Sequence, residues 1–102
     1  MRVRFTNQGE FVTSFAVEWN GGETDRTPEQ AGGTTATIDL DKYQIAPGTS
    51  CWARAYIVAG VNHDSQDNFN YNPGPQAIPH YTIYGGASTP HFQPVAWDPA
   101  DS

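Results

Sequence analysis

Alternation of apolar and polar residues with a period of two is the dominant pattern along this chain. In the segment FVTSFAVEW, one face of an extended strand would collect Phe11, Thr13, Phe15, Val17 and Trp19. Similar runs predict further strands at 34–40, 50–60 and 80–84. Shorter strands are expected at 2–6, 24–27 and 91–95. Since no segment has a helical period, the pattern predicts an all-β domain.

The inward faces of these strands are apolar enough to form a core. In the run at 50–60, the residues expected to point inward are Cys51, Ala53, Ala55 and Ile57. Strands with one apolar face pack most simply as two layers, so we predict a two-sheet antiparallel β-sandwich. The sandwich should occupy residues 1–95 as a single domain, followed by a flexible tail at 96–102 whose Trp97 could dock back onto the sandwich.

The composition narrows the possible partners. The chain has 102 residues, 16% of them charged, and a formal net charge of −6. A nucleic-acid partner is not expected, because binding to phosphates needs a basic surface. No run reaches the ~20 apolar residues of a membrane-spanning helix. The first residues, MRVRFTNQ, lack the apolar stretch of a signal peptide, so none is expected in this sequence.

Signatures of an enzyme are sparse. There is no nucleophile elbow and no glycine-rich phosphate loop. Cys51, the single cysteine, is expected to be a small buried residue rather than a nucleophile. Asp39 and Asp41 could form an acid–base pair, but solvated carboxylates at a strand end are the more common arrangement. We therefore expect a protein without catalytic residues.

Metal binding is a weak alternative in this sequence. The three histidines do not have the spacing of zinc ligands. His63, Asp64 and Asp67 could offer ligands to calcium, although neither the alternation nor the closing glutamate of an EF-hand is present. We expect no metal and no cofactor, and calcium stays open as the alternative.

The segment 62–72, NHDSQDNFNYN, is the most distinctive stretch, and we predict that it is a long loop. Planar amides and carboxylates form paired hydrogen bonds with sugar hydroxyls, and aromatic rings cover the C–H faces of sugars. The predicted ligand-binding residues are His63, Asp64, Asp67, Asn68, Phe69, Asn70 and Tyr71. A solvated loop whose Asn and Asp side chains cap their own turns is an equally good interpretation. A strand face with Trp52, Arg54 and Tyr56 is a second candidate, although packing as one half of the sandwich core is the better explanation for it.

The order of these segments resembles a known family. GEFVTSFAVEWN is similar to the first strand of the C-terminal domain of the thiol-activated, cholesterol-dependent cytolysins. In the same order follow TTATIDLDKYQIAPGTS, CWARAYIVAG and YTIYGGASTP, so that the resemblance covers residues 9–92. The resemblance implies an immunoglobulin-like β-sandwich. It also implies a cell-recognition module, which in that family contacts membrane sterol and, in several members, glycans.

The sequence departs from the family at its sterol-binding elements. The family's long loop is rich in tryptophan and begins with a reactive cysteine, whereas the corresponding residues 60–72 contain neither. The family's Thr-Leu pair corresponds here to Ala87 and Ser88. A chain of this length also has no room for the pore-forming domains. Since burying an unpaired amide in lipid costs about 2 kcal/mol or more, the resemblance favours a glycan over a sterol, and no membrane insertion is expected.

The sequence therefore leads to one principal hypothesis and two alternatives. The principal one is a lectin-like protein that binds a glycan of a cell surface or cell wall through residues 63–71. The alternatives are a membrane-acting component of a cytolysin-type toxin and a self-assembling structural domain. A homodimer is expected, because linking weak sites raises avidity.

Overall fold

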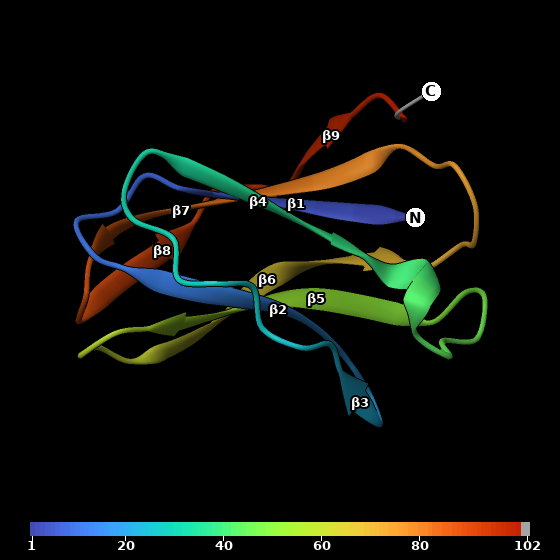
Figure 1. The fold of residues 1–102 in the computed structure, drawn as a ribbon, viewed down its shortest axis with the longest axis horizontal. Coiled ribbons are helices and arrows are strands. Elements are labelled where there is room, and N and C mark those ends of the chain that lie inside the picture. The colour runs from blue at the N-terminus through green and yellow to red at the C-terminus, as the bar shows by residue number, and fades with distance from the viewer. Residues whose placement is uncertain (101–102) are drawn as a thin grey trace.

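The chain folds into two β-sheets packed face to face (Figure 1). The computed structural model describes residues 1–100. The first sheet has the order β4-β1-β7-β8, with β9 also beside β7, and its strands are β4 (Thr34–Asp39), β1 (Arg2–Asn7), β7 (Ile78–Gly86), β8 (Thr89–Phe92) and β9 (Ala96–Asp98). The second sheet has the order β3-β2-β5-β6, with strands β3 (Gly22–Glu23), β2 (Thr13–Trp19), β5 (Ser50–Ile57) and β6 (Asn62–Asn70). One turn of 3-10 helix, η1 (Leu40–Lys42), follows β4.

The predicted all-β sandwich is confirmed, with one difference in strand direction. All strand pairs except one are antiparallel, and the exception joins β1 to β7 in parallel, with Phe5 opposite Tyr81. In the part of the chain that the structure describes, no helix has the length and apolar character needed to cross a bilayer.

The core fills the space between the two sheets, and aromatic rings form its centre. Phe5 of the first sheet stacks on Phe15 of the second at 4.9 Å between ring centroids, and Tyr81 lies 6.2 Å from Phe5. The alternation predicted for β5 is confirmed, because the four residues expected to face inward are all buried: Cys51, Ala53, Ala55 and Ile57. The second sheet is therefore held to the first by an apolar inner face.

The segment expected as a strand at 24–27 is an irregular edge beside β2. Thr24 donates its N–H to the carbonyl of Val17, and its hydroxyl accepts the N–H of Val17 at 3.0 Å. Thr27 repeats the arrangement with Phe15, whose N–H its hydroxyl accepts at 3.0 Å. The threonine hydroxyls accept the β2 N–H groups that the carbonyls of a neighbouring strand would otherwise accept. Segment 24–27 therefore has the composition of a strand without forming a regular β-ladder.

Two further predictions about the chain's organisation differ from the structure. The segment 62–72, predicted as a loop, is mostly the edge strand β6, paired with β5. Ala96–Asp98, expected in a flexible tail, form β9 against β7, while residues 101–102 of that tail lie outside the described part. The edge strand expected at 91–95 is β8, at Thr89–Phe92.

Candidate functional site

Strand β6 lies along one open side of the sandwich. It is the last strand of the second sheet and contacts β8 at the edge of the first. We call this side the lateral seam, formed by residues 63–72 on one wall and 92–97 on the other. The carboxylate of Asp67 crosses it, accepting the N–H of Val95 at 2.8 Å. The seam therefore carries most of the segment that the sequence singles out for recognition.

A β-bulge gives β6 its shape at the crossing point. The pairing register between β5 and β6 shifts between Trp52 and Arg54. At the shift, the hydroxyl of Ser65 accepts the N–H of Ala53 at 3.0 Å and donates to the carbonyl of Asp67 at 3.0 Å. The hydroxyl of Tyr81 donates to the same carbonyl at 2.9 Å. The bulge is thus fixed from both sheets, which holds Asp67 rigidly in the seam.

The larger hollow of the seam lies beyond the bulge and has a volume of about 390 Å³. Its lining combines an exposed indole, four carboxamides and a few other residues: Trp97, Asn68, Asn70, Asn72, Gln76, Ala77, Phe69 and Met1. Trp97 is 51% exposed although it lies in a paired strand. The amide of Asn68 donates to the hydroxyl of Ser50 at 3.1 Å, which orients it. The hollow offers an aromatic surface beside neutral donors and acceptors.

A smaller hollow of about 210 Å³ lies on the other side of the crossing. It is lined by His63, Ser65, Gln66, Asp67, Phe92, Gln93 and Pro94. The rings of His63 and Phe92 stack with their centroids 5.6 Å apart and their planes 12° from parallel. This hollow therefore also combines aromatic surface with carboxamides and a carboxylate.

The structure divides the seven predicted site residues into three groups. His63, Asp67, Asn68 and Asn70 line the lateral seam, so these four are brought together along it. The ring of Phe69 is 3% exposed and that of Tyr71 is 4% exposed, and both belong to the core. The expectation that either ring stacks on a sugar is wrong, because both rings are buried in the core.

Asp64 points away from the seam, across the outer face of the second sheet. Its two carboxylate oxygens accept hydrogen bonds from Arg54 at 2.5 and 2.9 Å, and this pairing holds the pKa of Asp64 below its usual range. His63, Asp64 and Asp67 consequently do not converge, and within residues 1–100 no three His, Cys, Asp or Glu side chains are grouped as metal ligands. The geometry does not favour the calcium alternative.

The second candidate face, around Trp52, Arg54 and Tyr56, is an outer surface rather than half of the core. Arg54 also pairs with Glu18 at 2.5 Å, and the guanidinium of Arg26 lies 3.6 Å from the centroid of the Tyr56 ring. Burial and a hydrogen bond with Glu23 raise the pKa of Glu18. Arg54 is thus the centre of a cluster of charges on the outer face, paired with both Glu18 and Asp64.

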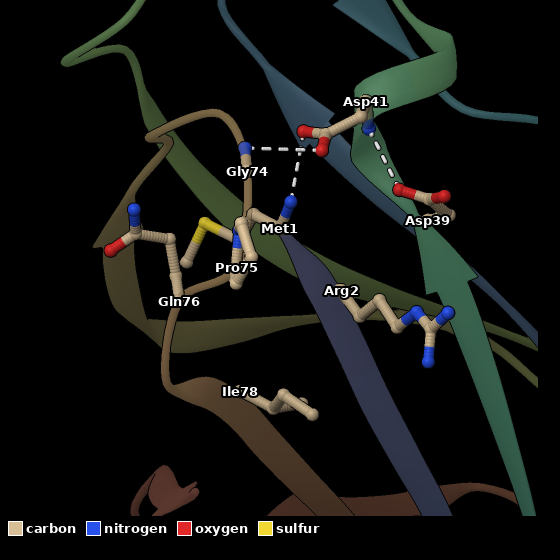
Figure 2. Close-up of a pocket in the computed structure, with 8 residues that line it drawn as sticks. All are labelled: Met1, Arg2, Asp39, Asp41, Gly74, Pro75, Gln76 and Ile78. Carbon is tan, nitrogen blue, oxygen red and sulfur yellow. Dashed lines mark hydrogen bonds and ion pairs between the residues drawn. The ribbon is translucent and has the colours of Figure 1, made fainter. Parts of the chain in front are cut away.

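The pair Asp39 and Asp41 lies at a third hollow, of about 290 Å³, shown in Figure 2. Asp39 caps η1 by accepting the N–H of Asp41 at 3.0 Å. The carboxylate of Asp41 accepts hydrogen bonds from the Met1 amino group at 2.8 Å, from the Tyr71 hydroxyl at 2.8 Å and from the Gly74 N–H at 3.1 Å. These bonds, that from Met1 foremost, hold the pKa of Asp41 below its usual range. Through these bonds Asp41 ties the N-terminus to Tyr71 and to the turn at Gly74.

Comparison with solved structures reveals a fold already known from toxins. Pneumolysin matches at a TM-score of 0.53 and 13% identity, over 96% of this chain and 23% of the toxin. Listeriolysin O matches at a TM-score of 0.51 and 14% identity, over 95% of this chain and 22% of the toxin. The shared fold is a cytolysin fold. The expected resemblance to the cytolysins is thereby confirmed at the level of fold.

Further comparisons set the extent of this likeness. A non-hemolytic pneumolysin from Streptococcus pneumoniae strain ST306 matches at a TM-score of 0.52 and 12% identity, over 96% of this chain and 23% of that one. The isolated membrane-binding domain of pneumolysin is covered over 92% of its length, at a TM-score of 0.47 and 13% identity. No protein-family model and no curated protein matches the chain. The chain spans less than a quarter of the length of the full toxins.

Trp97, Gln76, Phe92 and Gln93 are seam residues that the sequence interpretation did not assign to the site. Three of them follow β7 in the chain and are distant in sequence from β6, whereas Gln76 lies in the connection between β6 and β7. The available signal was Trp97 itself, a large aromatic residue in an otherwise polar tail. Its pairing opposite Pro79 brings it beside β6.

Proposed function

We propose that this chain is a non-enzymatic recognition module that binds a neutral glycan of a cell surface or cell wall along its lateral seam. The observation that carries the proposal is the larger hollow, in which the exposed indole of Trp97 lies beside four carboxamides. Both kinds of contact that a sugar ring offers are matched there, since the indole covers C–H groups and the amides pair with hydroxyls.

The type of glycan follows from charge. Among the described residues, no arginine or lysine lines either hollow of the seam, while Asp67 contributes a carboxylate. The chain as a whole carries a net charge of −6. Sialylated or sulfated glycans would be repelled and would find no guanidinium to pair with, so the ligand is a neutral glycan.

The likeness in fold supports a role at a cell surface. Pneumolysin shares the fold, and one of its domains is described as membrane-binding. The lateral seam is nevertheless a poor surface for insertion into lipid, because each of its exposed amides would lose hydrogen bonds worth about 2 kcal/mol or more. A hydroxyl-rich ligand replaces those hydrogen bonds.

A glycan array that contains neutral and anionic glycans tests the proposal. We expect binding to neutral glycans, and a loss of at least tenfold in affinity, about 1.4 kcal/mol, for Trp97→Ala. Asn70→Ala should weaken binding in the same direction. Tyr84→Ala is the matched control, since Tyr84 is an exposed aromatic residue that lines neither hollow.

Two outcomes would contradict the proposal. One is an array without any neutral ligand, and the other is equal binding by the parent and Trp97→Ala. Flotation with sterol-containing liposomes tests the membrane-acting alternative, and we expect the protein to remain unbound.

A further inference from the structure

The lateral seam has two hollows, and the carboxylate of Asp67 divides them where it reaches Val95. We propose that the smaller hollow is a second sugar subsite and that the ligand is a linear oligosaccharide lying across both hollows, rather than a single terminal sugar. This inference rests on the proposed function of the larger hollow. It adds the extended form of the ligand and a second set of binding residues.

The chemistry of the smaller hollow matches that of the larger one. The stacked pair of His63 and Phe92 contributes aromatic surface, as Trp97 does in the larger hollow. Gln66 and Gln93, both exposed, contribute carboxamides from opposite walls. A sugar ring placed there would meet the same two kinds of contact, one for its C–H groups and one for its hydroxyls.

The size of the smaller hollow shows why it would act as a subsite. Ligand pockets typically begin at about 300 Å³, and the smaller hollow, at about 210 Å³, falls below this range. The larger hollow, at about 390 Å³, falls within it. The smaller hollow is therefore suited to one ring of a chain whose other rings lie in the larger hollow.

The separation of the two hollows sets the length of the ligand. Asn70 of the larger hollow pairs with Ser50, and His63 of the smaller hollow pairs with Ala55, five residues further along β5, which corresponds to about 16 Å along a strand. This distance exceeds the width of one sugar ring, so only a chain of several units reaches from one hollow to the other. The hollows lie on the same strand and the same side of the sandwich, so that an extended chain can follow β6.

The ridge between the hollows is rigid and polar. Asp67 is fixed by the bulge, with its carbonyl bonded to Ser65 and Tyr81. Within residues 1–100, hydrogen bonds reach only Oδ2 of its carboxylate, from Val95, which leaves Oδ1 able to accept from a sugar hydroxyl. A chain that crosses the ridge would therefore gain a contact there. Because the walls are held before binding, little ordering cost opposes the second subsite.

The experiment is a titration with linear neutral oligosaccharides of one to six units, in separate series of glucose, mannose and N-acetylglucosamine, followed by calorimetry. We expect affinity to rise at least tenfold between the shortest bound sugar and the length that spans both hollows, and then to level off. The double variant Gln66→Ala/Gln93→Ala should abolish this gain and leave binding of the shortest sugar unchanged. Gln44→Ala, an exposed glutamine outside the lateral seam, is the matched control.

The outcomes separate this inference from the proposed function. If affinity is the same at every length while Trp97→Ala still weakens binding, the second subsite is refuted and the glycan site stands. The same conclusion follows if the double variant weakens short and long sugars equally, or weakens neither. If no sugar of any length binds and the array is also empty, both proposals fail.

Discussion

Ser65 fixes the bulge in β6, and replacing it with alanine tests whether that bulge depends on a side chain. The Ser65 hydroxyl is the partner of the buried N–H of Ala53, and it also donates to the carbonyl of Asp67. In Ser65→Ala the N–H of Ala53 loses its acceptor, whereas the carbonyl of Asp67 keeps the hydroxyl of Tyr81 as a donor. One buried group is thus left unpaired.

The expected cost follows from that single group. A buried donor without a partner costs about 1–3 kcal/mol, so we take about 2 kcal/mol for Ser65→Ala. For a domain of this size, each kcal/mol lowers Tm by about 4–8 °C, which gives a decrease of about 8–16 °C. A typical domain has about 5–15 kcal/mol of stability, so the variant should still fold.

Thermal and urea unfolding followed by circular dichroism measure this change. Ser88→Ala is the matched control, since Ser88 is exposed, and its free energy of unfolding should stay within about 0.5 kcal/mol of the parent. Tyr81→Phe alone should cost about 1 kcal/mol. In Ser65→Ala/Tyr81→Phe the carbonyl of Asp67 loses both donors, so the double variant should lose more than the sum of the two single changes.

Either of two results would refute the reasoning about the bulge. The first is a Ser65→Ala variant as stable as Ser88→Ala, which would mean that the N–H of Ala53 finds another partner. The second is strict additivity in the double variant, which would mean that Ser65 and Tyr81 do not share the carbonyl of Asp67.

Three further predictions concern ionisable groups. Burial raises the pKa of Cys51 to about 11, so Ellman's reagent at pH 8 should label this thiol only on unfolding, and rapid labelling of the native protein would contradict its burial. Burial, followed by the hydrogen bond to Asp41, raises the pKa of Tyr71 to about 12. The contribution of Tyr71 to the free energy of unfolding is therefore complete below pH 10 and is lost as the pH rises toward 12. When unfolding is measured against pH, Tyr71→Phe should show a smaller alkaline loss of stability than the parent. The hydrogen bonds from Arg54 lower the pKa of Asp64, so the contribution of Asp64 to the free energy of unfolding is present above about pH 4 and is lost at lower pH. Asp64→Asn should therefore make the stability less dependent on acid pH. An unchanged acid profile would contradict the pairing.

The sequence predicts well where the alternation is uninterrupted. In β5 the small and aliphatic residues at every second position face the core, and Cys51 is buried as expected. The polar 62–72 segment misleads for two physical reasons. Its buried positions are occupied by Ser65 and Phe69 rather than by aliphatic residues, and the bulge between them shifts the pairing with β5. Without a contrast between apolar and polar residues, the alternation along the strand cannot be read from the sequence.

The remaining differences depend on contacts between distant residues. The parallel pairing of β1 with β7 joins segments about 76 residues apart, as Arg4 opposite His80 shows, and no local pattern specifies a partner. Likewise β9 is only three residues long, too short for periodicity to reveal. Asp98 holds it in place through Arg4 at 2.7 Å and His80 at 2.9 Å. The wall of the lateral seam formed by residues 92–97 therefore could not be predicted from the sequence.

The proposed recognition depends on strand β9 remaining paired with β7. Trp97 reaches the larger hollow only while β9 is paired with β7, and Asp98 secures that pairing through two basic side chains. Any fraction of molecules in which β9 is detached would bind without its indole, and the apparent affinity would fall in proportion to the docked population. By the same linkage, a bound glycan would protect the amides of β9 from hydrogen exchange, and acid that protonates Asp98 would release the ligand by undocking the strand rather than by changing the sugar contacts.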